Sequence, residues 1–333
     1  MELESCLDIL TEKKLVTQVP TEALEVERLP GDASNREYAR LKEVATSKSF
    51  ILMIMNEKEA FKSEEAGATG QSSDELDFVA IGRDWIRAGI KVPQIYYVDE
   101  KSRFLLLEDF GNELLYGRRQ KESAIHLYEA AMRELIKIQK LQPFDRITKR
   151  KFSKELLIWE FEHFREYALE KRGVVLNEGQ SNVLKNFFES SVNCILKIPE
   201  TVTHRDYHSK NIMVLTDDKI GIIDFQDALM GPYTYDLASL LRDSYVRLTD
   251  QEEQKLIQIY ESESGRKVDL EAFAISSLQR NMKAVGRFFY ISMVKHKATH
   301  LPYVLPTMKR ILKSLEDIGE GELKRILENV SWE

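Results

Sequence analysis

The sequence predicts an α+β fold of two lobes: a small N-terminal lobe with an antiparallel sheet and one helix, and a larger, mostly helical C-terminal lobe. Three observations predict it. The chain has 333 residues, enough for two domains. Short apolar runs bounded by turn residues fill the first third, and helical spacing dominates the remainder. We therefore expect lobes at residues 1–107 and 113–333, joined by a hinge at residues 108–112.

The first lobe is expected to contain five strands and one long helix after a short amphipathic helix at residues 2–15. The expected strands cover residues 25–29, 37–44, 50–55, 94–98 and 104–107. Residues 75–88 have helical spacing that ends before Gly89. Residues 63–74 are rich in Glu, Gly and Ser, which indicates a loop.

The second lobe repeats the helical spacing of apolar residues in seven segments. The expected helices cover residues 122–140, 152–171, 178–197, 236–247, 251–262, 270–298 and 306–328. One hairpin interrupts them, with strands at residues 212–215 and 220–223 around a turn. If Leu215 lies opposite Ile220, then Asn211 lies opposite Asp224, with Cβ atoms about 5 Å apart.

The residues that flank this hairpin predict the chemistry. His204, Arg205, Asp206 and Asn211 form the pattern H-R-D-x-x-x-x-N, and Asp224 follows the second strand. This is the spacing of the catalytic loop and the metal-binding acid in kinase-type phosphotransferases. Asp206 can accept the proton of an attacking hydroxyl, and the two later residues offer the oxygen ligands that Mg²⁺ prefers. The sequence therefore predicts ATP and Mg²⁺ as cofactors.

The whole chain resembles the aminoglycoside phosphotransferase and choline kinase superfamily, which has the protein-kinase-like fold. The matching stretches are residues 31–38, 105–111, 204–211, 223–228, 231–243 and 279–286. They are most similar to the bacterial anomeric sugar kinases of cell-wall recycling, which phosphorylate N-acetylmuramate and N-acetylglucosamine. The resemblance implies a two-lobed protein-kinase-like fold. It also implies transfer of the γ-phosphate of Mg-ATP to a small-molecule hydroxyl, here C1 of one of these amino sugars.

Several residues near the predicted base are candidates for other roles. His204 is expected to brace the catalytic loop, and Lys210 to reach the γ-phosphate. Asp236 is expected either to accept hydrogen bonds from the backbone of this loop or to cap its own helix. The candidate acceptor-binding residues are Asp227, Arg242, Arg280 and Lys283. The three cations among them suit an anionic group such as the lactyl carboxylate of muramate, whereas Asp227 can equally be a solvated loop acid.

Two departures from protein kinases concern the nucleotide. The loop at residues 30–36 contains only Gly31 in place of a glycine-rich clamp, and Met53 stands where a kinase strand has a lysine. Ser34 and Arg36 are therefore expected to contact the phosphates, with Arg40 as the next candidate; alternatively both arginines are solvated. The hinge residues expected to meet adenine are Leu107, Glu108, Asp109 and Phe110.

Composition narrows the remaining function classes. A net charge of −7 argues against a nucleic-acid partner. No apolar run is long enough for a membrane span, and the acidic N-terminus lacks the pattern of a signal peptide, so we expect the cytoplasm. The expected partner is a small-molecule substrate, with the chain a monomer or a weak dimer. Two alternatives stay open: an aminoglycoside or choline-type kinase, and a nucleotide-binding pseudokinase acting through interactions, which only the missing lysine favours.

Overall fold

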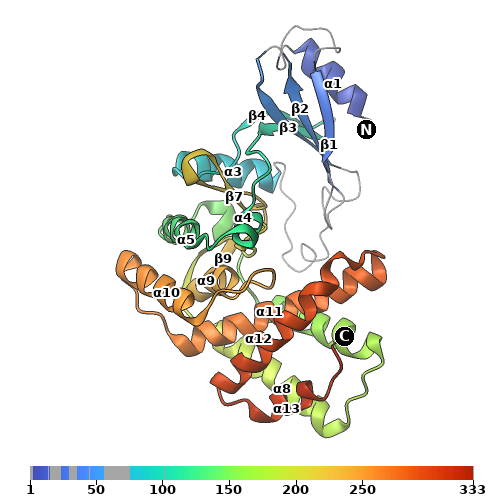
Figure 1. The fold of residues 1–333 in the computed structure, drawn as a ribbon, viewed down its shortest axis with the longest axis vertical. Helices are drawn as coiled ribbons and strands as arrows, with labels where there is room; N and C mark the ends of the chain where they lie inside the picture. The colour runs from blue at the N-terminus through green and yellow to red at the C-terminus, as the bar shows by residue number, and fades with distance from the viewer. Residues whose placement is uncertain are drawn as a thin grey trace. The chain divides into compact units, whose positions relative to one another are not determined.

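The computed structural model describes residues 3–13, 15, 24–29, 36–44, 46–55, 76–101 and 103–332. These residues form an α+β fold, as the sequence predicts (Figure 1). They group into two compact units, the first comprising residues 1–112 with 221–226 and the second residues 113–220 with 227–333. Two loops expected from the sequence lie outside the described residues: the loop at residues 30–36, apart from Arg36, and the loop at residues 63–74.

The first unit contains a five-stranded antiparallel sheet with strand order β1-β2-β3-β5-β4. Its strands are β1 (Leu24–Leu29), β2 (Glu37–Glu43), β3 (Ser49–Ile54), β4 (Ile95–Asp99) and β5 (Phe104–Glu108). Helix α1 (Leu3–Glu12) buries Cys6 and Leu10 in the same core as Leu52 and Leu106. Because side chains alternate along a strand, Met53 and Leu105 face the other side of the sheet.

The remaining long helix of the first unit is α3 (Asp77–Arg87). Two of its aromatic side chains, Phe78 and Trp85, pack on Phe225, with ring centroids 4.7 and 5.7 Å away. Gly82 keeps this packing close, because a Cβ atom there would lie 3.2 Å from the Phe225 ring. Phe225 directly follows Asp224, so this helix fixes the segment that carries the predicted metal-binding acid.

The second unit is mostly helical, as predicted. Its helices are α4 (Leu115–Lys121), α5 (Ile125–Gln139), α6 (Asp145–Thr148), α7 (Lys154–His163), α8 (Glu178–Ile195), α9 (Tyr233–Leu241), α10 (Asp250–Ser264), α11 (Leu270–Val294), α12 (Val304–Asp317) and α13 (Gly321–Glu328). Figure 1 shows α11 and α12 side by side. Helix α11 also packs against α7, α8 and α9, which makes it the central helix of this unit.

Several boundaries differ from those expected. The segment 306–328 forms two helices, because Gly319 adopts φ = +81° between them. A two-stranded sheet of β6 (Glu200–Thr203) and β9 (Leu229–Pro232) was not expected, since strands of only four residues carry little periodicity. In the hairpin of β7 (Ile212–Val214) and β8 (Ile220–Ile222), the Leu215 amide donates to the Lys219 carbonyl at 2.7 Å. Leu215 therefore lies opposite Lys219, one residue before Ile220, the partner that the sequence predicts.

Helix α7 ends in a π-helical turn, η2 (Phe164–Leu169), at the point where α11 approaches it. Gly286 of α11 allows this approach, because a Cβ atom there would lie 2.7 Å from the His163 carbonyl and from the Phe164 nitrogen. Those atoms belong to the backbone and cannot rotate away. The sequence predicts one continuous helix over residues 152–171, and the π turn marks where close packing overrides local periodicity.

Gly286→Ala is therefore expected to destabilise the protein by about 1–3 kcal/mol through overpacking. Gly321→Ala is the matched control, because no atom lies within 4 Å of a Cβ built at the start of α13. Since alanine is the better helix former, this control should be neutral or slightly stabilising. Urea denaturation of both variants measures the difference, and equal free energies of unfolding would contradict the packing argument.

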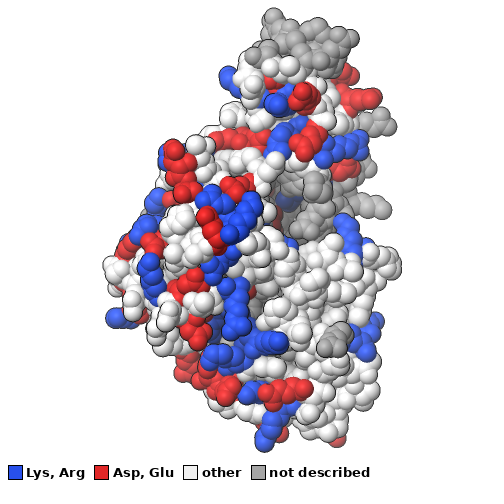
Figure 2. All heavy atoms as spheres, in the orientation of Figure 1, with Lys and Arg blue, Asp and Glu red and all other residues white. Residues whose placement is uncertain are grey.

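The surface shows both signs of charge. Figure 2 shows Lys and Arg side chains interspersed with Asp and Glu over part of the face in view, beside a large area with few charged side chains. Within the described part of the chain, no helix is long and apolar enough to cross a membrane.

Candidate functional site

Two buried carboxylates hold the catalytic loop by its backbone. Asp236, in the first turn of α9, accepts hydrogen bonds from the amides of His204 at 2.6 Å and Arg205 at 3.0 Å. Asp243, just after the same helix, accepts from the amide and the hydroxyl of Ser209 at 2.9 and 2.5 Å. The first of the two roles predicted for Asp236 is confirmed. Burial raises the pKa of Asp236 to about 7, although its two amide donors favour the ionised form.

The loop conformation is strained at the residue before the predicted base. Arg205 adopts φ = +76°, a region that residues with a Cβ atom rarely occupy. The Asp236 bonds to two consecutive amides determine this conformation. In addition, the imidazole Nδ1 of His204 accepts from the Asp206 amide at 3.2 Å, which is the bracing contact that the sequence predicts for His204. Such strain typically clusters at functional sites, where the surrounding structure maintains it.

Beneath the loop, Glu160 of α7 is completely buried and receives three donors. They are Arg205 Nη2 at 2.8 Å, Gln279 Nε2 at 2.7 Å and Lys283 Nζ at 2.7 Å. Burial disfavours the charged form of Glu160, but Lys283 and Arg205 outweigh it and hold its pKa below the ordinary value. Lys283, a predicted acceptor-binding residue, is thus placed in an ion-pair network that supports the catalytic loop.

Asp206 lies beside Arg280 of α11, with Oδ1 3.4 Å from Nη1 and a side chain that is 35% exposed. Desolvation disfavours its charged form, but Lys283 and Arg280 overcome this and hold the pKa of Asp206 well below its usual range. Burial and Arg280 lower the pKa of His208 to about 4, so this neighbouring imidazole is neutral at pH 7. The site therefore presents an ionised carboxylate next to a buried guanidinium.

The residues predicted to bind metal have defined local contacts. Asn211 donates from Nδ2 to the Asp206 carbonyl at 3.0 Å, which fixes the orientation of its amide. Asp224 adopts φ = +63° and accepts from Gln226 Nε2 at 2.8 Å. Asn211 belongs to the second unit and Asp224 to the first, so a shared cation stays a prediction. Among the described residues, no cluster of three or more His, Cys, Asp or Glu could hold a metal by itself.

The hinge segment is held by charged contacts inside the first unit. Arg40 donates to both carboxylate oxygens of Asp109, at 2.7 and 3.1 Å, and to the Gly111 carbonyl at 3.0 Å. Arg40 is thus engaged with the hinge, which makes it a poor substitute for the absent strand lysine. Glu108 pairs with Lys91 at 2.6 Å, and its amide donates to the Gln94 carbonyl.

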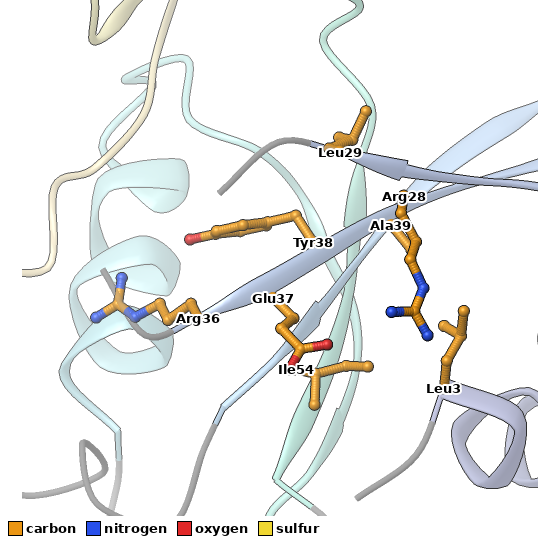
Figure 3. Close-up of a pocket in the computed structure, with 8 residues that line it drawn as sticks. All are labelled: Leu3, Arg28, Leu29, Arg36, Glu37, Tyr38, Ala39 and Ile54. Atoms are coloured by element: carbon orange, nitrogen blue, oxygen red, sulfur yellow. The ribbon is translucent and has the colours of Figure 1, made fainter. Parts of the chain in front are cut away.

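Arg36 lines a pocket of about 230 Å³ in the first unit (Figure 3). Its side chain and that of Tyr38 project from the start of β2 on the same side, and Arg28 also lines the pocket. Ser34, which is predicted to contact the phosphates together with Arg36, lies outside the described residues. Met53 is fully buried between Tyr38 of β2 and Leu105 of β5, so this position contributes to the sheet core.

Two predicted acceptor residues have other described partners. Arg242 pairs with Glu253 at 3.1 Å, donates to Ser314 and stacks on Phe273, which links α9 to its neighbouring helices. Asp227 lies 3.8 Å from Arg150. No described contact brings either residue to Asp206. Sequence reasoning missed the supporting roles of Glu160 and Asp243, although the spacing of Asp236 and Asp243 at the two ends of one helix was a visible signal.

Comparison with known proteins places these features in a family. The model of the phosphotransferase enzyme family matches residues 25–270. An N-acetylmuramate/N-acetylglucosamine kinase of Pseudomonas putida is 30% identical over 260 residues, which is 74% of this chain and 76% of the relative. The protein of the same name from Pseudomonas aeruginosa is 27% identical over 96% of this chain and 93% of its own length.

Solved structures show the same fold at lower identity. A choline kinase from Streptococcus pneumoniae superimposes with a TM-score of 0.65 at 18% identity, covering 94% of this chain and 99% of its own. An ADP-bound aminoglycoside phosphotransferase gives a TM-score of 0.60 at 14% identity, covering 93% and 98%. The matched range includes the strained catalytic loop, Asp206 and the two carboxylates that hold the loop. The chain therefore belongs to the phosphotransferase enzyme family and is an ATP-dependent small-molecule kinase.

Proposed function

We propose that this kinase transfers the γ-phosphate of Mg-ATP to the C1 hydroxyl of N-acetylmuramate or N-acetylglucosamine. The observation that carries the proposal is the juxtaposition of Asp206 with Arg280, a base beside a cation that an anionic sugar can engage. The names of the curated relatives support it. A phosphorylated cell-wall sugar is the product, and the cytoplasm, where ATP is available, is the proposed location.

Asp206 acts as the general base in this proposal. Its depressed pKa makes it a weak base, so it suits a hydroxyl that loses its proton readily. The anomeric hydroxyl of a reducing sugar is more acidic than the other ring hydroxyls. When the lactyl carboxylate of muramate pairs with Arg280, it offsets part of the positive charge that depresses the Asp206 pKa. Binding of the acceptor thus raises the basicity of the group that activates it.

The nucleotide is assigned to residues 1–107, the adenine hinge to residues 108–112 and the acceptor to residues 113–333. Ser34 and Arg36 are the proposed phosphate contacts, and Leu107, Glu108, Asp109 and Phe110 are the proposed adenine contacts. Asn211 and Asp224 fit Mg²⁺ by donor chemistry, since an amide and a carboxylate supply hard oxygen ligands. Few protein ligands are needed, because Mg²⁺ on ATP takes its other ligands from phosphate and water. When bound, the metal would neutralise phosphate charge.

A panel of amino sugars, aminoglycosides and choline, each incubated with Mg-ATP, tests the proposal. The expected product is a sugar 1-phosphate, which loses reducing-end reactivity and hydrolyses readily in mild acid. Phosphorus NMR coupled to the anomeric proton identifies the position. Phosphorylation at C6, or turnover of choline or kanamycin without turnover of any amino sugar, would overturn it.

Arg280→Met should raise the KM for N-acetylmuramate by about 10- to 100-fold, because it removes a charge-assisted contact but keeps an apolar stem. The KM for N-acetylglucosamine, which lacks the carboxylate, should change much less. Arg287→Met, about two turns further along α11, is the matched control, and its guanidinium stacks on Tyr290. Steady-state kinetics with both sugars decide the matter, and equal changes for the two acceptors would show that Arg280 does not bind the carboxylate.

A further inference from the structure

The ammonium group of Lys210 lies in a cage of three tyrosine rings. Its Nζ is 4.0 Å from the ring centroid of Tyr245, 4.7 Å from that of Tyr303 and 5.3 Å from that of Tyr116. The three tyrosines come from α4, from the segment after α9 and from η5 (Ala298–Tyr303), so the fold assembles the cage from distant parts of the second unit. All four residues are half-buried, so each keeps part of its surface exposed to solvent.

The walls of this tyrosine cage are fixed by contacts that do not involve the lysine side chain. The hydroxyls of Tyr116 and Tyr303 share a hydrogen bond of 2.8 Å, and the rings of Tyr303 and Tyr245 meet edge to face at 4.9 Å. Buried Phe288 and His300 pack behind Tyr245 at 5.7 and 6.2 Å. We therefore expect the cage to keep its form when Lys210 is shortened.

The cage adjoins the predicted base. Lys210 follows Asp206 by four residues in the same loop, and the Tyr245 ring packs edge-on against His208 at 5.2 Å. The Tyr116 amide also donates to the Ser209 carbonyl. Several aromatic faces arranged around one point attract ammonium groups, and most strongly quaternary ones, which are poorly hydrated. A cationic acceptor approaching Asp206 would find this cage already filled by a tethered cation.

We propose that Lys210 determines acceptor specificity by occupying the tyrosine cage, and so excludes quaternary ammonium compounds such as choline. Because Lys210 is covalently part of the loop, it competes for the cage at an effective concentration that dilution does not lower. Discrimination arises because a second cation would have to displace Lys210 and then lie beside its charge. The inference rests on the proposed function only in requiring an acceptor that is not a cation. It assigns Lys210 a role distinct from the γ-phosphate contact that the sequence predicts.

Titration calorimetry with tetramethylammonium chloride, at constant ionic strength set with sodium chloride, tests this directly. Lys210→Ala should bind tetramethylammonium with a millimolar Kd, and wild type at least tenfold more weakly. Lys210→Arg should behave as wild type, because arginine also supplies a cation to the cage. The double variant Lys210→Ala/Tyr245→Ala should lose the binding, since it removes the nearest wall. If Lys210→Ala fails to fold, Lys210→Ser takes its place, and the same binding of tetramethylammonium is expected.

Three results would overturn the proposal: no binding by folded Lys210→Ala and Lys210→Ser, equal binding by wild type, or binding that persists without Tyr245. The measurement uses neither ATP nor sugar, so its failure leaves the proposed function standing. Conversely, an acceptor panel that excludes amino sugars would not alter the binding result. The two hypotheses are therefore tested separately.

Discussion

Asp206→Asn is expected to lower the turnover number by about 10²- to 10⁴-fold while binding of Mg-ATP persists. The amide keeps the shape of the carboxylate but cannot accept the proton of the attacking hydroxyl. It also removes the charge that faces Arg280 at 3.4 Å. Single-turnover kinetics at saturating nucleotide and sugar isolate the chemical step, and a nucleotide-binding titration on the same sample shows whether the site survives.

Asp217→Asn serves as the matched control for this substitution. Asp217 is an exposed acid in the turn between β7 and β8, and its φ of +60° is one that asparagine tolerates. This variant should turn over like wild type. Wild-type turnover in Asp206→Asn would mean that another group accepts the proton, and the neutral imidazole of His208 would then be the first to replace.

Glu160→Gln should destabilise the protein by about 3 kcal/mol and also reduce turnover. Glu160 pairs with both Arg205 and Lys283, at 2.8 and 2.7 Å. Its neutralisation removes the buried carboxylate that both cations contact, and breaking a buried ion pair on one side is costly. Turnover is expected to fall because Arg205 precedes the proposed base, Asp206, and is held in a strained conformation. Urea denaturation and kinetics on one preparation measure both effects.

The same substitution changes how stability depends on pH. The folded protein holds the pKa of Glu160 below its unfolded value of about 4.3. The unfolded chain therefore binds more protons in acid, and the free energy of unfolding falls as the pH drops below about 4.3. Glu160→Gln should flatten this acid limb relative to wild type. Glu155→Gln, at an exposed position in the first turn of α7, should flatten the limb much less, because solvent screens the local hydrogen bonds that lower the Glu155 pKa.

Local patterns predicted much of the fold because the elements concerned are regular. The strand at residues 50–55 was recognisable as a run of apolar residues, and the structure places it at the centre of the sheet as β3. Helix α11 was expected to within a few residues of its ends. Where tertiary packing determines the local structure, the periodicity of the sequence did not predict it. Nothing in the residues around His163 indicates a π turn, and the backbone there packs closely on Gly286, more than a hundred residues further along the chain.

The residues of the candidate site also fall into two groups: those that a local sequence pattern identifies and those that only the fold brings together. Asp206 is identified by its neighbours in the chain, and so is His204, because the loop motif is contiguous. Glu160 lies 45 residues before Arg205 and looks like an ordinary helical acid until the fold brings them together. Lys283 was predicted to bind substrate because its charge was visible, whereas its carboxylate partner was not. Tyr116 precedes Lys210 by 94 residues, and Tyr245 and Tyr303 follow it by 35 and 93, so no local pattern reveals them.

The catalytic loop is anchored at both ends through main-chain groups, and this has a consequence for protein engineering. Asp236 and Asp243 bind amides, which every amino acid except proline provides. None of these bonds uses the side chain at position 208 or 210. Both side chains can therefore be exchanged while the backbone bonds that position the base are kept. A library randomised at these two positions, with proline omitted, should remain folded while it samples new acceptors. The loop thus combines a fixed backbone with side chains that can be replaced.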